Sequence, residues 1–336
     1  MSKLGRRLVL ALLLGVAVYG ALVLARGFGQ IKASFEVYAW WTFAAACGLA
    51  FSNYVLRFLK WEYYLALLDI RGIPKGESFL TFLSGFVLTV TPGKVGEVFK
   101  SVILYQLRQV PIARSAPIVV AERVTDLIGV IVIIAVGSLS FPGGMVWATL
   151  GALAVGLLLG LVASRTLSGW LLGLLPRLPG ALGRVGGRVA PKVGLALREL
   201  RGLTTPARLV WPTLLSIGAW SLEGIGLWTI LRGFSEQPPL PLTAFFYATA
   251  TLAGALVPVP GGLGVTDKLL EEQMAHLGGV PSATATAAML LVRFATLWFA
   301  VLVGFAALGL LRARHPHLIA EGDMPPGGSG SPSEPV

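Results

Sequence analysis

Long apolar stretches recur along the whole chain, and they constrain the fold more than any other feature of the sequence. Six of them can cross a hydrocarbon core of about 30 Å, which takes roughly 17 to 25 helical residues. They lie at 8–25, 37–59, 115–139, 145–163, 209–231 and 282–311. Only 13% of the residues are charged, against roughly 25% in soluble domains. The sequence therefore predicts an all-α polytopic membrane protein with one transmembrane domain, 1–312, and a disordered cytoplasmic tail, 313–336.

Four further apolar stretches are too short to span a bilayer, and they come in two pairs. The first pair is Phe79 to Val90 and Val95 to Leu107; the second is Leu242 to Val257 and Leu263 to Leu277. Such interrupted segments predict two re-entrant helical hairpins, which mark the binding region in many transporters. Simple kinks with small residues packed closely remain an alternative. The expected breaks are at Pro92, Gly93 and Gly96 and at Pro258, Pro260, Gly261, Gly262 and Gly264.

A spacing repeats between the two broken regions. Val110-Pro111 is followed by Arg123 and Val280-Pro281 by Arg293, and in both the arginine comes twelve residues after the proline. This indicates an internal duplication, with halves of about 1–141 and 142–312. Three full spans in each half turn the second half upside down, so the predicted fold is an inverted repeat of six spans and two hairpins.

Loop charges predict the orientation. The 165–208 loop holds eight Lys or Arg against one acid, Glu199. Because cytoplasmic loops are enriched in Lys and Arg, this loop and both termini are expected on the cytoplasmic side. Arg57 and Lys60, at the end of the second apolar stretch, are interpreted as side chains that reach out to the interface.

Charged residues within the predicted spans and beside the breaks are the candidate binding residues. Glu122, Arg123 and Asp126 share one span and Arg293 lies in another; charges at such depth are costly and usually face a cavity. A local pair of Arg123 with Asp126, three residues apart, is the structural alternative. Helix N-termini that begin after the two breaks would also face a buried anion. The predicted substrate-binding residues, expected around one central cavity, are Lys94, Glu97, Lys100, Glu122, Arg123, Asp126, Asp267 and Arg293.

Several kinds of site are not indicated. The single cysteine and three histidines form no metal-ligand spacing, and no nucleophile is grouped with a base, so we expect neither a metal nor a cofactor and favour a transporter over an enzyme. The net charge of +11 lies in loops between apolar runs and suggests anionic lipid headgroups rather than nucleic acid. The sequence leaves open whether the protein forms a homo-oligomer.

Three motifs carry a resemblance to a known family. At Thr91-Pro92-Gly93-Lys94-Val95-Gly96-Glu97, at Glu122-Arg123-x-x-Asp126 and at Pro258-Val259-Pro260-Gly261-Gly262-Leu263-Gly264, the chain resembles the lysylphosphatidylglycerol synthase transmembrane region, or flippase-like domain, family. The resemblance covers nearly the whole chain, to Leu311, and we expect the transmembrane region of this family without its soluble synthase domain.

The resemblance implies a prokaryotic inner-membrane protein with a flippase-like domain, which moves or binds an anionic or isoprenoid-linked lipid headgroup. The alternative is a membrane-embedded enzyme, or an accessory subunit, of lipid-linked sugar or aminoacyl-lipid metabolism.

Overall fold

Helices make up all the regular secondary structure in the described part of the chain. A computed structural model describes residues 19–20, 28–91, 97–177, 187, 203, 205–257 and 259–318. The helices are α2 (Phe28–Glu36), α3 (Trp40–Leu67), α4 (Lys75–Ser84), η1 (Gly85–Leu88), α5 (Phe99–Arg108), α6 (Ile112–Ser138), α7 (Gly144–Ala163), α8 (Arg165–Leu174), η3 (Leu175–Arg177), α10 (Pro206–Gly233), α11 (Leu240–Leu256), η4 (Pro260–Gly262), α12 (Val265–His276), α13 (Ser282–Arg293), η5 (Phe294–Trp298) and α14 (Phe299–Arg314). The predicted all-α class is confirmed.

Three of the described helices are long and apolar enough to cross a bilayer. They are Trp41–Leu67, Ala207–Gly233 and Ser282–Arg314, at the positions of three predicted spans. The helices α6 and α7 occupy two more predicted positions, although α6 carries three charged residues near its centre. The predicted span 8–25 lies outside the described residues except for Tyr19 and Gly20. The count of six spans therefore stays a prediction.

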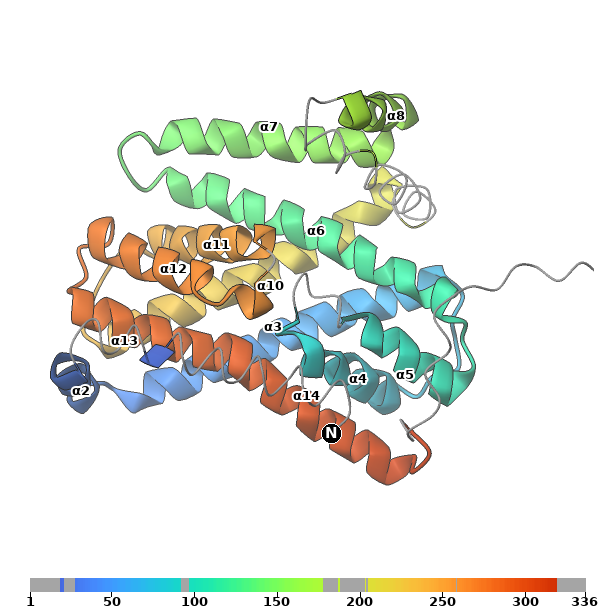
Figure 1. The fold of residues 1–336 in the computed structure, drawn as a ribbon, viewed down its shortest axis with the longest axis horizontal. Helices are drawn as coiled ribbons and strands as arrows, with labels where there is room; N and C mark the ends of the chain where they lie inside the picture. The colour runs from blue at the N-terminus through green and yellow to red at the C-terminus, as the bar shows by residue number, and fades with distance from the viewer. Residues whose placement is uncertain are drawn as a thin grey trace, which may run out of the picture.

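The helices α3 and α10 run antiparallel through the middle of the molecule (Figure 1). The amide of Ala39, just before α3, donates to the carbonyl of Gly233, the last residue of α10. Near the middle of both helices the Asn53 side chain donates to the Ala219 carbonyl over 2.7 Å. The helix α6 packs on α10 and α7 packs on α6, which gives the layered arrangement visible in Figure 1.

Two pairs of short helices enter this bundle from opposite ends (Figure 1). The pair α4 and α5 begins where α3 ends, and the pair α11 and α12 begins where α10 ends. The helices of each pair contact each other. The predicted breaks at Pro92, Gly93, Gly96 and Pro258 lie outside the described residues. The second break is described at Pro260, Gly261, Gly262 and Gly264, where the last three have positive φ angles, which glycine adopts without strain.

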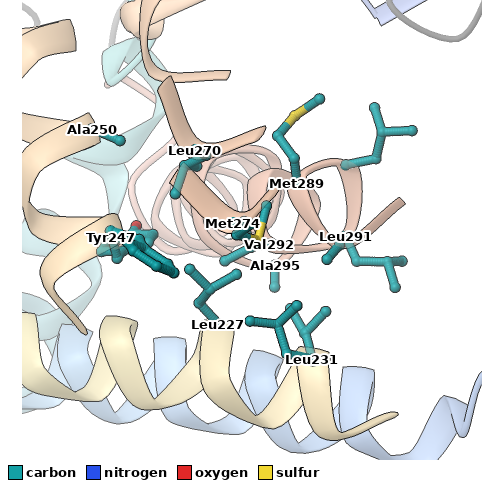
Figure 2. Close-up of a cluster of buried hydrophobic side chains, with 14 of the residues drawn as sticks. Leu227, Leu231, Tyr247, Ala250, Leu270, Met274, Met289, Leu291, Val292 and Ala295 are labelled. Carbon is teal, nitrogen blue, oxygen red and sulfur yellow. The ribbon is translucent and has the colours of Figure 1, made fainter. Parts of the chain in front are cut away.

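Apolar side chains, most of them from the second half of the chain, fill one large core (Figure 2). Leu227 on α10, Leu270 and Met274 on α12, and Val292 on α13 each have no exposed surface. A second core joins α3, α4 and α6 around Tyr54 and other buried apolar side chains. These cores hold the two short helix pairs rigidly against the long helices.

One predicted helix boundary is wrong. The second apolar stretch was expected to end at residue 59, but α3 continues to Leu67 because the amphipathic segment after it packs Trp61, Tyr64 and Leu65 into the second core. The error comes from ending the helix where polar residues begin. The predicted tail, 313–336, lies outside the described residues beyond residue 318; α14 ends at Arg314 and the turn after it buries Leu318.

A close contact of α14 with the first helix pair gives a testable stability prediction. A Cβ on Gly304 would lie 2.6 Å from the backbone nitrogen of Val87, whereas a Cβ on Gly309 of the same helix meets nothing within 4 Å. Gly304→Ala is therefore expected to cost about 1 to 3 kcal/mol through overpacking and to lower the thermal unfolding midpoint in detergent. Gly309→Ala is the matched control and should leave it unchanged or higher. Equal midpoints would contradict the described packing.

Candidate functional site

A cavity of about 350 Å³ lies at the centre of the bundle, between the two helix pairs. Its walls come from α3, α6, α10, α11, the second break and the helix that runs from α13 into α14. Three of the predicted binding residues, Arg123, Asp126 and Arg293, line it together. Glu122, which was expected to converge with these three, does not line the cavity, and a role of any of them in binding stays a prediction.

A network of ion pairs joins α3, α5 and α6 beside the cavity. The Asp126 carboxylate lies 2.5 Å from Lys60 Nζ and 3.7 Å from Arg57 Nη2. Glu97, just before α5, contacts Arg123 at 2.5 Å and Arg57 at 3.5 Å. Arg123 also reaches Asp126 at 3.5 Å, so the local pair and the cavity position, weighed as alternatives in the sequence, both occur. The network joins three cations to two carboxylates, and the carboxylate of Glu223 lines the same cavity.

Lys60 does not reach the interface, as its place at the end of an apolar stretch had suggested. Its side chain is fully buried, and Nζ donates to Asp126 and, over 2.8 Å, to the Ser216 hydroxyl of α10. The prediction was wrong because α3 continues for two further turns, so Lys60 lies inside the bundle. Since a buried ammonium is tolerated only when paired, Lys60 ties α3 to both α6 and α10.

Lys100 and Glu122 form a separate buried ion pair, which does not line the cavity. The Lys100 ammonium also lies 4.6 Å from the ring centroid of Trp61 and 5.3 Å from that of Phe82, within the range of a cation–π contact. The two carboxylates of α6, Glu122 and Asp126, are thus each compensated by a lysine from another helix. This arrangement holds α5 onto α6, behind the cavity wall.

The pair of Arg293 with Asp267 stabilises the second break. Arg293 Nε lies 2.7 Å from Asp267 Oδ1, and Arg293 Nη2 donates to the Gly261 carbonyl over 2.6 Å. The other oxygen of Asp267 accepts the backbone amide of Gly264, the N-cap of α12, over 2.7 Å. The anion at this helix N-terminus is therefore the carboxylate of Asp267 itself. A short π-helical turn, Phe294–Trp298, follows Arg293 directly.

The two arginine pairs occupy corresponding places in the two halves. In each, a carboxylate at the start of the second short helix contacts an arginine that comes 26 residues later in the following long helix: Glu97 with Arg123 and Asp267 with Arg293. The spacing of the carboxylates was not used in the sequence analysis, because the distance from the Pro-Gly motif to the carboxylate differs between the halves. Only the contact reveals the correspondence.

Several cavity residues were not predicted. Arg57 and Glu223 line the cavity with the aromatic side chains Tyr54, Trp220 and Tyr247. The Tyr247 hydroxyl donates to Glu223 Oε2 over 3.2 Å. Glu223 stands out in the sequence as a charge within an apolar run, but nothing in the sequence indicates that α10 turns it toward this cavity.

One predicted binding residue, Lys94, lies outside the described residues. Within the described ranges, no three His, Cys, Asp or Glu side chains gather closely enough to hold a metal ion.

Comparison with known proteins places the chain in a family. It is 29% identical over 151 residues to a UPF0104 membrane protein of Methanothermobacter thermautotrophicus, and the alignment covers 44% of each chain. The family model for the lysylphosphatidylglycerol synthase TM region matches residues 8–304. This match and the apolar helices identify a membrane protein of a lipid-related family: the chain belongs to the lysylphosphatidylglycerol synthase TM region family.

Proposed function

We propose that this protein binds the anionic, phosphate-bearing headgroup of a membrane lipid in its central cavity and moves it across the bilayer. One observation carries the proposal: Arg57, Arg123 and Arg293, from three different helices, line one cavity inside an apolar bundle. An arginine at such depth costs at least about 2.5 to 3.5 kcal/mol in lipid. Carboxylates compensate all three in this structure, and three guanidinium groups around one space suit a ligand with several anionic oxygens.

The chemistry of the three side chains favours phosphate. A guanidinium presents a planar fork of donors that matches two phosphate oxygens at once. Of the two arginines that the sequence predicted, Arg123 is the more accessible: 30% of its side chain is exposed, against 8% for Arg293. A headgroup would therefore reach Arg123 first in this conformation and compete with Glu97 for it.

The finer architecture belongs to the same proposal. We infer six spans and two re-entrant hairpins related as an inverted repeat, with the corresponding Arg123 and Arg293 pairs as support. Such repeats rock around a central site and expose it to one side at a time. The basic 165–208 loop favours an inner-membrane orientation with that loop and both termini in the cytoplasm.

Lipid movement in reconstituted vesicles tests the proposal. We expect the protein to accelerate movement of fluorescent phosphatidylglycerol or of a fluorescent isoprenyl phosphate between leaflets. Arg123→Gln removes the accessible guanidinium and should reduce the rate strongly, since hydrogen bonds to charged groups contribute about 1.5 to 3 kcal/mol each. Arg314→Gln, at the exposed end of α14, is the matched control. Transport of neither lipid by the unmodified protein, or equal rates in both variants, would overturn it.

A further inference from the structure

Apolar residues on one side of the central cavity are exposed, and we infer a side opening there from their exposure. Leu256, the last residue of α11, lines the cavity and is 77% exposed, and Val257 beyond it is 39% exposed. Leu127 of α6, partly exposed, lines the cavity from the other side. The opening is thus bounded by α6 and by the end of α11.

The two helices that bound the opening touch near the C-terminus of α6 and line the cavity about three turns away. At Gly137 the backbones are so close that a Cβ would lie 2.5 Å from the Pro241 carbonyl oxygen and 2.8 Å from the Phe245 Cβ. About three turns away along both helices, Leu127 and Leu252 line the cavity. The opening therefore lies between them where α11 ends, and the contact at Gly137 closes it toward the end of the bundle where α11 begins.

The opening lies at mid-height of the bundle. Leu127 is near the middle of α6 (Ile112–Ser138), a helix of roughly 40 Å at 1.5 Å per residue, and α11 ends at Leu256 where its chain breaks. The middle of a helix of that length lies within the hydrocarbon core, which is about 30 Å thick. Exposed leucines at this height face lipid tails rather than water.

Polar and apolar parts of the same space thus adjoin. Three arginines line its interior, while Leu127, Val130, Leu252 and Leu256 line the side toward the opening. A water-soluble anion would satisfy only the arginines. An amphiphile with an anionic head and a hydrocarbon chain satisfies both parts. Its head binds the arginines, and its chain passes through the opening into the surrounding lipid, so that it stays in an apolar environment.

We propose that the opening between Leu127 and Leu256 is a portal through which the hydrocarbon chain of the bound lipid extends into the bilayer while its headgroup stays at the arginines. The inference rests on the proposed function and adds the path of the chain. It assigns the contact with the first methylene groups to Leu127, to Leu256 and to Ala255, which is exposed and also lines the cavity. It also requires a ligand with a hydrocarbon tail.

Photo-cross-linking in vesicles that contain the full chain tests the portal. Two probes are used, phosphatidylglycerol with a diazirine in the upper part of one acyl chain and phosphatidylglycerol with a diazirine on its headgroup, and labelled residues are located by mass spectrometry. We expect the acyl probe to label the segment around Leu256 or Leu127 and the headgroup probe to label cavity residues around Arg123. Inorganic phosphate lacks a tail and makes no contact at the opening, so it should displace the acyl probe only at concentrations far above that of the lipid.

Variants at the opening separate the portal from the site. Ala255→Trp and, independently, Leu127→Trp fill the opening and should abolish labelling by the acyl probe there. In the unmodified protein, the headgroup probe should still label the cavity. Leu302→Trp, on a 66% exposed position of α14 away from the cavity lining, is the control and should keep both labels.

The outcomes distinguish the two proposals. Labelling of the cavity by the headgroup probe, with the acyl probe attached only elsewhere or unaffected by both tryptophans, overturns the portal and leaves the proposed function standing. Absence of cavity labelling by both probes overturns both. Displacement of both probes by phosphate at concentrations comparable to that of the lipid would point to a water-soluble anion and would also overturn the portal.

Discussion

A Lys60→Met variant is expected to lose about 3 to 5 kcal/mol of unfolding free energy, because removing one partner of a buried ion pair leaves the other charge uncompensated. Lys60 is fully buried and is the closest cation to Asp126, at 2.5 Å. The loss also removes the contact to Ser216 on α10. Unfolding in mixed micelles with increasing denaturing detergent would measure it.

Two controls make the Lys60 result specific. Lys75→Met removes a lysine that is 79% exposed and pairs with Glu62, so it should cost only about 0 to 1 kcal/mol. The double variant Lys60→Met/Asp126→Asn removes both buried charges and should lose less than the two single changes added together. Equal losses for Lys60→Met and Lys75→Met would show that the buried network does not stabilise the fold.

Arg293→Ala is expected to abolish lipid transport and to lower the thermal unfolding midpoint. The change removes a guanidinium from the cavity and leaves Asp267, whose side chain has no exposed surface, without its cation. Hydrogen bonding to the Gly261 carbonyl is lost as well, so the second break loses part of its support. The midpoint and the vesicle transport rate are measured on the same preparation. Arg312→Ala, at an exposed position of α14, should change neither.

A double variant separates stability from transport at this site. Arg293→Gln/Asp267→Asn keeps similar side-chain volumes and removes both charges, so no uncompensated charge is buried. It should recover most of the unfolding midpoint while transport stays absent, because a neutral amide does not replace the guanidinium toward phosphate. Recovery of transport together with stability would show that Arg293 acts only in holding the break.

The two halves differ in how tightly their arginine is held. Arg293 is engaged by Asp267 and by the Gly261 carbonyl and is nearly buried, whereas Arg123 shares two carboxylates with Arg57 and stays accessible. In an inverted repeat the two halves exchange their conformations as access alternates. The proposed transport cycle therefore expects the opposite conformation to release Arg293 and enclose Arg123.

The sequence alone determined the class of the protein and pointed to three charged residues that line its central cavity. Apolar stretches of bilayer length fix an all-α membrane fold, because the bilayer core offers the backbone no other partners. Charges placed inside those stretches identified Arg123, Asp126 and Arg293, since such residues are too costly to keep in lipid without a reason. The Pro-Gly motifs located the second break, at Gly261 and Gly262, for the related reason that glycine adopts positive φ.

Only the tertiary structure decided which charges belong together and which face the cavity. Lys60 and Arg57 looked like interface residues because the apolar pattern ended beside them, but α3 continues and turns them to Asp126. Lys100 and Glu122 were predicted to bind substrate like the charged residues near them in sequence, yet they pair with each other behind the cavity wall. Hydrophobic periodicity is a property of a single helix, whereas an ion pair depends on how two helices are rotated and shifted along their axes relative to each other. Those are set by packing between helices distant in sequence, so the partner of each buried charge was decided by the fold.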